Sequence, residues 1–377
     1  MKKHFLAAGL GCLFLTHLSC PAMAQFAALN GKTITADVFD GFLQRQMDSL
    51  GMPGLSIAII NDDKIVYRRA LGVANVDTKA GVDEQSIFEA ASMSKPVFAY
   101  LVMRMVDKGL LDLDTPLYRY MPYPDIERDD RYKLITARIV LTHRTGFPNW
   151  RYFNRADTSL HVHFPDLYLK FTPGTAYSYS GEGFLYLAKV VAHLNARDLQ
   201  SLEPLYEQEV AVPLGMQHAW FTGNGYITQH KVSGHVNGKV RVDHGMNWPI
   251  AFPNWDSTYF NPAASLHTDA VSYAEFIIGL MKGEGLSKKS LDEMLKPQYP
   301  LPDSLADNKD EHSGVGLGIF MVRTPFGIRY EHGGNNGNFQ SHFVWFKPQK
   351  EAYVFFTNCD KGDAFNKRLQ EFFATGK

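Results

Sequence analysis

A serine and a lysine stand three positions apart at the start of an apolar segment. The stretch EAASMSKPVFAYLVMRMVDKG, residues 89–109, contains this pair as Ser92 and Lys95. Positions i and i+3 of a helix share one face, so the hydroxyl and the amine can meet. A buried lysine can lose its proton at neutral pH and act as a base that turns serine into a nucleophile. The pair indicates covalent catalysis, and the open alternative is a helix-capping serine beside a solvated lysine.

Two later stretches carry groups suited to the same chemistry. Tyr179 precedes a helix that we expect to begin near Glu182. A tyrosine close to a lysine can relay protons when positive charge lowers its pKa. His332, Gly333 and Gly334 close an apolar strand, where glycines allow a second backbone to approach. Taken singly, these features also fit a packed aromatic residue and an ordinary turn.

The order and wide spacing of these stretches resemble the penicillin-recognising serine hydrolases. That superfamily includes class C β-lactamases, D-alanyl-D-alanine carboxypeptidases, D-aminopeptidases and β-lactamase-like family VIII esterases. Its motifs are Ser-x-x-Lys, Tyr-x-Asn, and Lys-Thr-Gly or His-Gly-Gly, in that order. The resemblance covers nearly the whole mature chain, because family-like segments recur at LTHRTGFP (141–148), VPLGMQHAWF (212–221), AASLHT (263–268) and GVGLGIFM (314–321).

The resemblance implies an acyl-enzyme mechanism. Ser92 would be the acylated nucleophile and Lys95 its partner in proton transfer. Tyr179 would protonate the leaving group and activate the water that removes the acyl group. The substrate would be a small molecule or a peptide, and the chemistry needs no cofactor.

The third motif would bind the substrate and hold the oxyanion. His332 occupies the basic position of that motif. The oxyanion hole would consist of the backbone N–H groups of Ser92 and Asn335, the latter just past Gly333 and Gly334. Such a pair of donors aimed at a tetrahedral oxygen is typically a large catalytic contribution.

Two departures from the family pattern bear on the substrate. Gly181 stands where β-lactamases of this type place Asn, and His332-Gly333-Gly334 replaces Lys-Thr-Gly. Both changes remove groups that would grip a β-lactam carboxylate, so we expect an ester or a short D-amino-acid peptide as substrate. The alternatives are a β-lactamase and a binding protein that cell-wall peptides acylate without turnover. Arg144 also departs from the usual small or polar residue, and the sequence assigns it no role.

The elements that must position these residues come from both ends of the chain. LSIAII (55–60) and IVYRRALGVAN (65–75) predict a hairpin, and alternating apolar runs after residue 312 predict further strands before a last helix at 363–376. Residues 96–112, 182–196 and 270–282 have helical spacing. We therefore expect an α+β fold of the β-lactamase/transpeptidase type. One antiparallel sheet from about 32–90 and 312–377 would be flanked by helices, with a mostly helical insert at about 96–300.

The first residues differ from the rest. MKKHFLAAGLGCLFLTHLSCPAMA has a basic start, a short apolar stretch and a small-x-small end, which is typical of a secretory signal peptide. We expect cleavage after Ala24, so that residues 25–377 form a secreted or periplasmic hydrolase domain. Lipoprotein anchoring at Cys20 is the alternative. Cleavage leaves Cys359 alone, which excludes an intramolecular disulfide.

The remaining composition excludes several classes of function. Of 377 residues, 45% are hydrophobic and 20% charged, the profile of a globular protein. The formal net charge is −1 and the basic residues are dispersed, so we expect no nucleic-acid partner. No later segment is predicted to span a membrane.

Three further polar or aromatic features have competing interpretations. His161, His163 and Asp166 superficially resemble zinc ligands, but zinc needs three or four convergent groups, so we expect no metal. The aromatic segment 244–262 could form an apolar wall for the substrate or a small core of its own. Glu182 could tune Tyr179 or serve as a first-turn acid, and we favour the helix role.

Overall fold

The computed structural model describes residues 25–151, 166–241, 258–301 and 312–376. The predicted signal peptide lies outside the described residues, as do His161, His163 and most of the aromatic segment 244–262. The cleavage site and the bounds of the mature domain therefore stay predictions. Within the described ranges, no helix is long and apolar enough to cross a bilayer.

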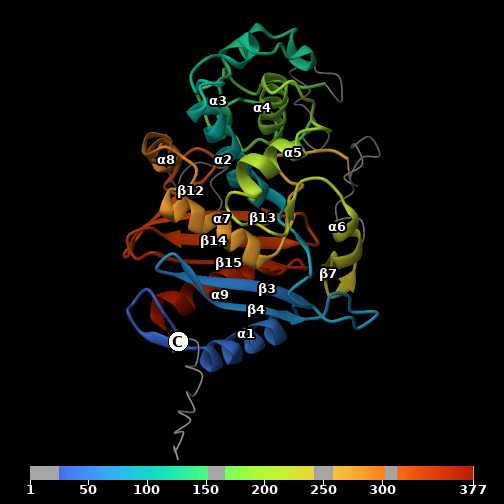
Figure 1. The fold of residues 1–377 in the computed structure, drawn as a ribbon, viewed down its shortest axis with the longest axis vertical. Coiled ribbons are helices and arrows are strands. Elements are labelled where there is room, and N and C mark those ends of the chain that lie inside the picture. Colours follow the sequence, from blue (N-terminus) through green and yellow to red (C-terminus); the bar gives the residue numbers. More distant parts are fainter. Residues whose placement is uncertain (1–24, 152–165, 242–257, 302–311, 377) are drawn as a thin grey trace, which may run out of the picture.

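An eight-stranded antiparallel sheet forms the centre of the molecule (Figure 1). Its order is β10-β11-β12-β13-β14-β15-β3-β4, so C-terminal strands lie beside N-terminal ones. The join is the β15–β3 pair, in which Val354 lies opposite Ala58. The strands are β3 (Gly54–Asn61), β4 (Lys64–Gly72), β10 (Tyr299–Pro300), β11 (Gly314–Val315), β12 (Phe320–Thr324), β13 (Gly327–Asn335), β14 (Gln340–Phe346) and β15 (Glu351–Thr357).

Helices cover both faces of this sheet, and β3 shows why. Successive strand residues point to opposite faces, so a strand with apolar residues on both faces is buried on both sides. Leu55 and Ile57 join one core together with α1 (Ala36–Leu50) and α9 (Gly362–Thr375). Ala58 and Ile60 join the other core, which includes the helical region.

That helical region comes from the middle of the sequence, between the two segments that supply the strands of the sheet, as predicted (Figure 1). The predicted helices at 96–112, 182–196 and 270–282 correspond to the observed α2, α4 and α7. The helices are α2 (Ser94–Asp107), α3 (Ala137–Leu141), α4 (Gly181–Leu194), α5 (Glu203–Tyr206), α6 (Gly225–His230), α7 (Ala270–Lys282) and α8 (Lys288–Leu295). The predicted class, an antiparallel sheet flanked by helices with a mostly helical insert, is confirmed.

Short strands complete the described fold. One three-stranded sheet has the order β5-β9-β6 and leads directly into the turn that carries Ser92. Two hairpins lie elsewhere, β1 with β2 and β7 with β8. These strands are β1 (Gln25–Ala27), β2 (Thr33–Thr35), β5 (Phe88–Glu89), β6 (Ala219–Trp220), β7 (His235–Val236), β8 (Lys239–Val240) and β9 (His267–Thr268).

The expectation of sheet over about 32–90 is too broad. Residues 36–50 form α1, whose Phe39, Leu43 and Met47 are buried at four-residue spacing. Gly51 ends the helix with φ 65°, a left-handed conformation that glycine adopts without strain. The long strands of this segment are confined to β3 and β4.

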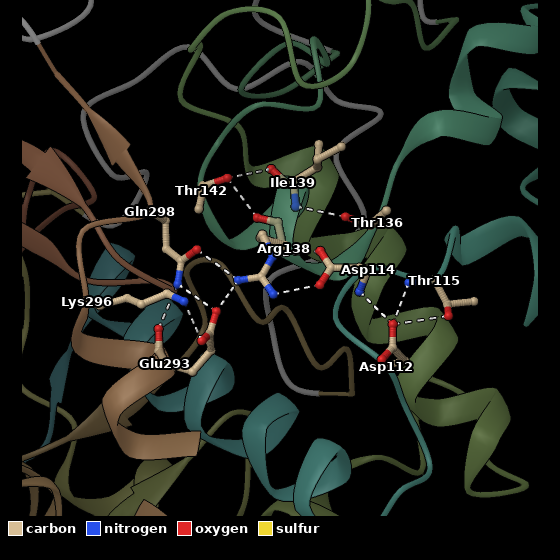
Figure 2. Close-up of polar contacts among 10 residues, drawn as sticks. All are labelled: Asp112, Asp114, Thr115, Thr136, Arg138, Ile139, Thr142, Glu293, Lys296 and Gln298. Carbon is tan, nitrogen blue, oxygen red and sulfur yellow. Dashed lines mark hydrogen bonds and ion pairs between the residues drawn. The ribbon is translucent and has the colours of Figure 1, made fainter. Parts of the chain in front are cut away.

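An ion-pair network fixes α3 against α8 (Figure 2). The Arg138 guanidinium donates to both carboxylate oxygens of Asp114, at 2.7 Å each, and to Gln298 at 2.8 Å. It also pairs with Glu293 of α8. The Thr142 hydroxyl donates to the Arg138 carbonyl at 2.7 Å, so the network fixes the end of α3 as well.

Removing one aromatic ring from the core between the sheet and helices α1 and α9 tests whether these helices pack on the sheet. Phe39 is fully buried, and its ring centroid lies 5.1 Å from that of Phe26 and 5.3 Å from that of Phe372. Phe39→Ala should lower the free energy of unfolding by about 3–5 kcal/mol, because it leaves a cavity. Val38→Ala, at a side chain 54% exposed on the same helix, is the control. Equal urea midpoints for the two variants would contradict the layer assignment.

Candidate active site

Ser92 and Lys95 meet at the beginning of α2. Ser92 lies in a 3-10 turn (Ala91–Met93) directly before the helix, and Lys95 lies in the helix's first turn. Lys95 Nζ is 3.2 Å from Ser92 Oγ. Ala91 has φ 49°, a left-handed conformation that is strained for alanine. Such strain clusters at functional sites, and here it immediately precedes the serine.

Burial determines the charge of Lys95. The side chain is 1% exposed, and Nζ donates to the Ala263 carbonyl at 2.8 Å. Nζ also lies 4.6 Å from the Tyr179 ring centroid and 5.7 Å from that of Phe184. Within the described part of the chain, no carboxylate pairs with it. Desolvation therefore holds the pKa of Lys95 well below its ordinary value, which makes the amine available as a base.

Tyr179 reaches the site from the residue before the N-cap of α4. Ser180 caps that helix, because its hydroxyl accepts the Gly183 N–H at 3.1 Å. The half-buried Tyr179 ring stacks on His143 with 4.2 Å between centroids. Its centroid lies 6.4 Å from that of His332. The structure thus gathers Tyr179, Lys95 and His332 from three distant parts of the chain.

His332 occupies the third-motif position as a buried ring. It is 2% exposed, and its Nδ1 lies 2.7 Å from the Gly333 carbonyl oxygen. Burial, followed by the nearby Lys95, lowers the pKa of His332 well below its ordinary value. The residue in the basic position of the motif is therefore a neutral imidazole at neutral pH. The neutral state follows from burial, which the residue type alone does not reveal.

The end of β13 lies against the turn that carries Ser92. Strand β12 pairs with β13 only as far as Glu331, whereas β14 pairs with it as far as Asn335. A Cβ on Gly334 would lie 2.1 Å from the Ala90 carbonyl oxygen, so this close approach requires glycine. The Ser341 hydroxyl of β14 donates to the same oxygen at 2.9 Å. Gly334 thus allows the end of β13, which includes Asn335, to lie beside the turn that carries Ser92.

A tryptophan fills the space beside Gly181. A Cβ at that position would lie 2.5 Å from two carbons of the Trp150 indole. Trp150 is 8% exposed, so the indole is a packed part of the structure. At the position where the family places the second-motif asparagine, this chain has Gly181, and the Trp150 indole occupies the space that an asparagine side chain would fill. No sequence spacing links residues 150 and 181, and sequence reasoning missed this pair.

Two charged residues near the motifs hold the scaffold together. The Arg144 guanidinium donates to the Gly174 carbonyl and lies 4.4 Å from the Tyr299 ring centroid. The Glu182 carboxylate is 2% exposed and accepts from Arg151 Nη2 at 2.9 Å. The carboxylate thus anchors the first turn of α4, in line with the favoured helix role.

His143 is a residue that sequence reasoning missed. It lies in the family-like segment 141–148, which was the available signal, and it is 1% exposed beneath Tyr179. Of the candidate metal ligands, only Asp166 lies among the described residues. Among the described residues, no group of three or more His, Cys, Asp or Glu side chains could hold a metal ion. Asp166 pairs with Arg128 at 3.7 Å.

Comparisons with known proteins extend the motif resemblance to most of the chain. The family model described as Beta-lactamase matches residues 39–374. Esterase EstB from Burkholderia gladioli is 26% identical over 301 residues, covering 74% of this chain and 74% of the esterase. A beta-lactamase from Pseudomonas fluorescens is 30% identical over 191 residues, covering 49% of this chain and 50% of that protein.

A solved structure shows the same fold. The D-alanine carboxypeptidase AmpC from Burkholderia cenocepacia matches with a TM-score of 0.67 at 18% identity, over 86% of this chain and 95% of that chain. This confirms the predicted β-lactamase/transpeptidase-like architecture. The family match includes every motif residue from Ser92 to Asn335. The chain therefore belongs to the beta-lactamase family, within the penicillin-recognising serine hydrolases that its motifs resemble.

Proposed function

We propose that the protein is an exported serine hydrolase that forms an acyl-enzyme with an ester, an amide or a short D-amino-acid peptide. The observation that carries the proposal is the buried Lys95 amine 3.2 Å from the Ser92 hydroxyl. A neutral amine at hydrogen-bond distance can accept the serine proton as Oγ attacks the substrate carbonyl. The backbone N–H groups of Ser92 and Asn335 would stabilise the oxyanion.

Collapse of the tetrahedral intermediate then releases the first product. Tyr179 would donate a proton to the leaving oxygen or nitrogen as its bond to carbon breaks. Water, activated by the same tyrosine, would attack the acyl-enzyme and release the acid. The contact between Lys95 Nζ and the Tyr179 ring supports this assignment, because it keeps the two groups side by side.

The neutral third motif supports an ester or an uncharged amide over a β-lactam. A β-lactam carries a carboxylate, and its recognition favours a fixed positive charge. His332 is uncharged because it is buried, and the indole of Trp150 takes the place of a polar second-motif side chain. The similarity to esterase EstB over most of both chains agrees with this preference.

Intact mass spectrometry after brief exposure to p-nitrophenyl butyrate tests the proposal. The wild-type protein should gain one butyryl group and release p-nitrophenol over many turnovers. Ser92→Ala should lose the adduct and lower turnover by about 10³-fold or more, because the nucleophile is gone. A parallel exposure to a penicillin distinguishes the related activities.

Each outcome of this experiment has a distinct meaning. Continued penicillin turnover would restore the β-lactamase alternative. A stable adduct without turnover would favour a binding protein. No Ser92-dependent adduct with either compound would contradict the proposal.

The rate of Ser92 acylation should depend on the protonation of Lys95. It should rise with pH as the lysine loses its proton, and it should level off well below pH 10.5, because burial lowers the pKa. Lys95→Arg keeps a permanent positive charge and should lower kcat/KM by about 10²-fold or more. Stopped-flow measurements from pH 5 upward check the pH dependence of acylation and the loss of activity in Lys95→Arg. A rise centred near 10.5, or an active Lys95→Arg variant, would contradict the assigned base.

Restoring the motif asparagine tests the interpretation of Trp150. Gly181→Asn should lower the free energy of unfolding by about 1–3 kcal/mol, because the new side chain overlaps the indole. Trp150→Ala in the same chain should remove that penalty, so the two changes should be strongly non-additive in urea unfolding. The double variant should also raise the ratio of penicillin to ester turnover. Additive stability effects would show that the two sites do not compete for space.

A further inference from the structure

We infer that His143 is a positioning residue that fixes Tyr179 for proton transfer. This inference rests on the proposed function, in which Tyr179 protonates the leaving group. His143 belongs to none of the three catalytic motifs and has no part in the proposed chemistry, yet it makes three contacts with Tyr179 and the two residues that flank it. Each contact restrains a different part of the segment that carries the phenol.

Two of the contacts bracket Tyr179 along the backbone. The His143 carbonyl accepts the Ser178 N–H at 2.9 Å, and the His143 Nδ1 accepts the Ser180 N–H at 3.1 Å. The residues on either side of the tyrosine are thus both bonded to one histidine. Since Ser180 also caps α4, the segment is fixed between the histidine and the helix.

The third contact fixes the ring itself. The imidazole stacks on the Tyr179 phenol at 4.2 Å between centroids, with 28° between the planes. The phenol ring also lies 4.6 Å from Lys95 Nζ. Rotation of Tyr179 about its side-chain bonds would therefore disturb its contacts with both the histidine and the lysine.

His143 is rigid enough to serve as this support. Its N–H donates to the Val140 carbonyl at 2.9 Å, and it directly follows Thr142, whose hydroxyl bonds back to α3. The Arg138 network holds α3 against α8 (Figure 2). The backbone of His143 has φ 56°, an unusual conformation that the surrounding structure must maintain.

Packing alone does not explain a histidine at this position. Because Nδ1 accepts a hydrogen bond, the proton of the neutral ring is on Nε2. Among the described residues, Nε2 is buried without a hydrogen-bond partner. A phenyl ring would fill the space without burying an unsatisfied donor. What the phenyl ring lacks is the Nδ1 acceptor that holds the Ser180 N–H.

A double-mutant cycle with Tyr179 tests the inference. His143→Phe keeps the stacked ring but removes the acceptor, and it should lower kcat for p-nitrophenyl butyrate by about 10- to 100-fold with KM changed less than about twofold. In the Tyr179→Phe background, the same change should cost less than about twofold, because the positioned hydroxyl is already absent. His143→Asn should recover most of kcat, since its side-chain oxygen can replace Nδ1 and asparagine tolerates the left-handed backbone.

Controls separate positioning from folding. His218→Phe is a matched change, because His218 also stacks on a tyrosine, Tyr226, at 4.7 Å, and it should leave kcat within about twofold. Thermal unfolding identifies any variant that fails to fold, and if His143→Phe does so, His143→Ala, which also removes the Nδ1 acceptor, carries the cycle. Equal losses from His143→Phe in both backgrounds would overturn the inference alone. Absence of Ser92-dependent turnover in the wild type would overturn the proposed function and the inference with it.

Discussion

The site depends on one constraint, the burial of the Lys95 amine beside the Ser92 hydroxyl. An exposed lysine is protonated at neutral pH and cannot accept a proton from serine. Here the amine lies in a largely apolar surrounding, bonded to a single carbonyl, that of Ala263. The free-energy cost of a buried charge favours the neutral amine. Any change that admits water or a carboxylate would restore the charge on Lys95 and remove the proposed base.

The fold creates that environment by bringing distant segments to one place. The 3-10 turn before α2 supplies the serine, the first turn of α2 supplies the lysine, and the residue before the N-cap of α4 supplies the tyrosine. The end of β13 lies against the serine's turn because Gly334 has no side chain to separate them. The sheet that positions β13 needs strands from both ends of the chain. The site therefore exists only in the folded chain, although each of the segments that form it is short.

Motif order was enough to predict the fold class and to locate the residues that the structure gathers. The family-like stretches identified Ser92, Lys95, Tyr179 and His332, because each motif is local in sequence. Helix α1 was missed even though Phe39, Leu43 and Met47 have helical spacing. That signal was present, but the segment was included in the sheet expected over about 32–90.

Other features had no local signal at all. The displacement of the motif side chain by Trp150 depends on two segments that meet only in the folded chain. The two hydrogen bonds that join His143 to Ser178 and Ser180 form with His143 in a left-handed backbone conformation, which no residue pattern reveals for histidine. The neutral state of His332 follows from burial, whereas the motif position suggested a basic group. Sequence therefore predicted which residues meet, and the structure adds their charge states and supports.

The most direct test of this account is the titration of Lys95 by nuclear magnetic resonance on protein labelled at the lysine ε-carbon. Comparison with Lys95→Met, which lacks the residue but keeps a side chain of similar length, assigns the signal. The account predicts one lysine signal, absent from the variant, that titrates well below 10.5. If every lysine signal in the wild-type protein titrates near that ordinary value, Lys95 is protonated at neutral pH, and the proposed base is wrong.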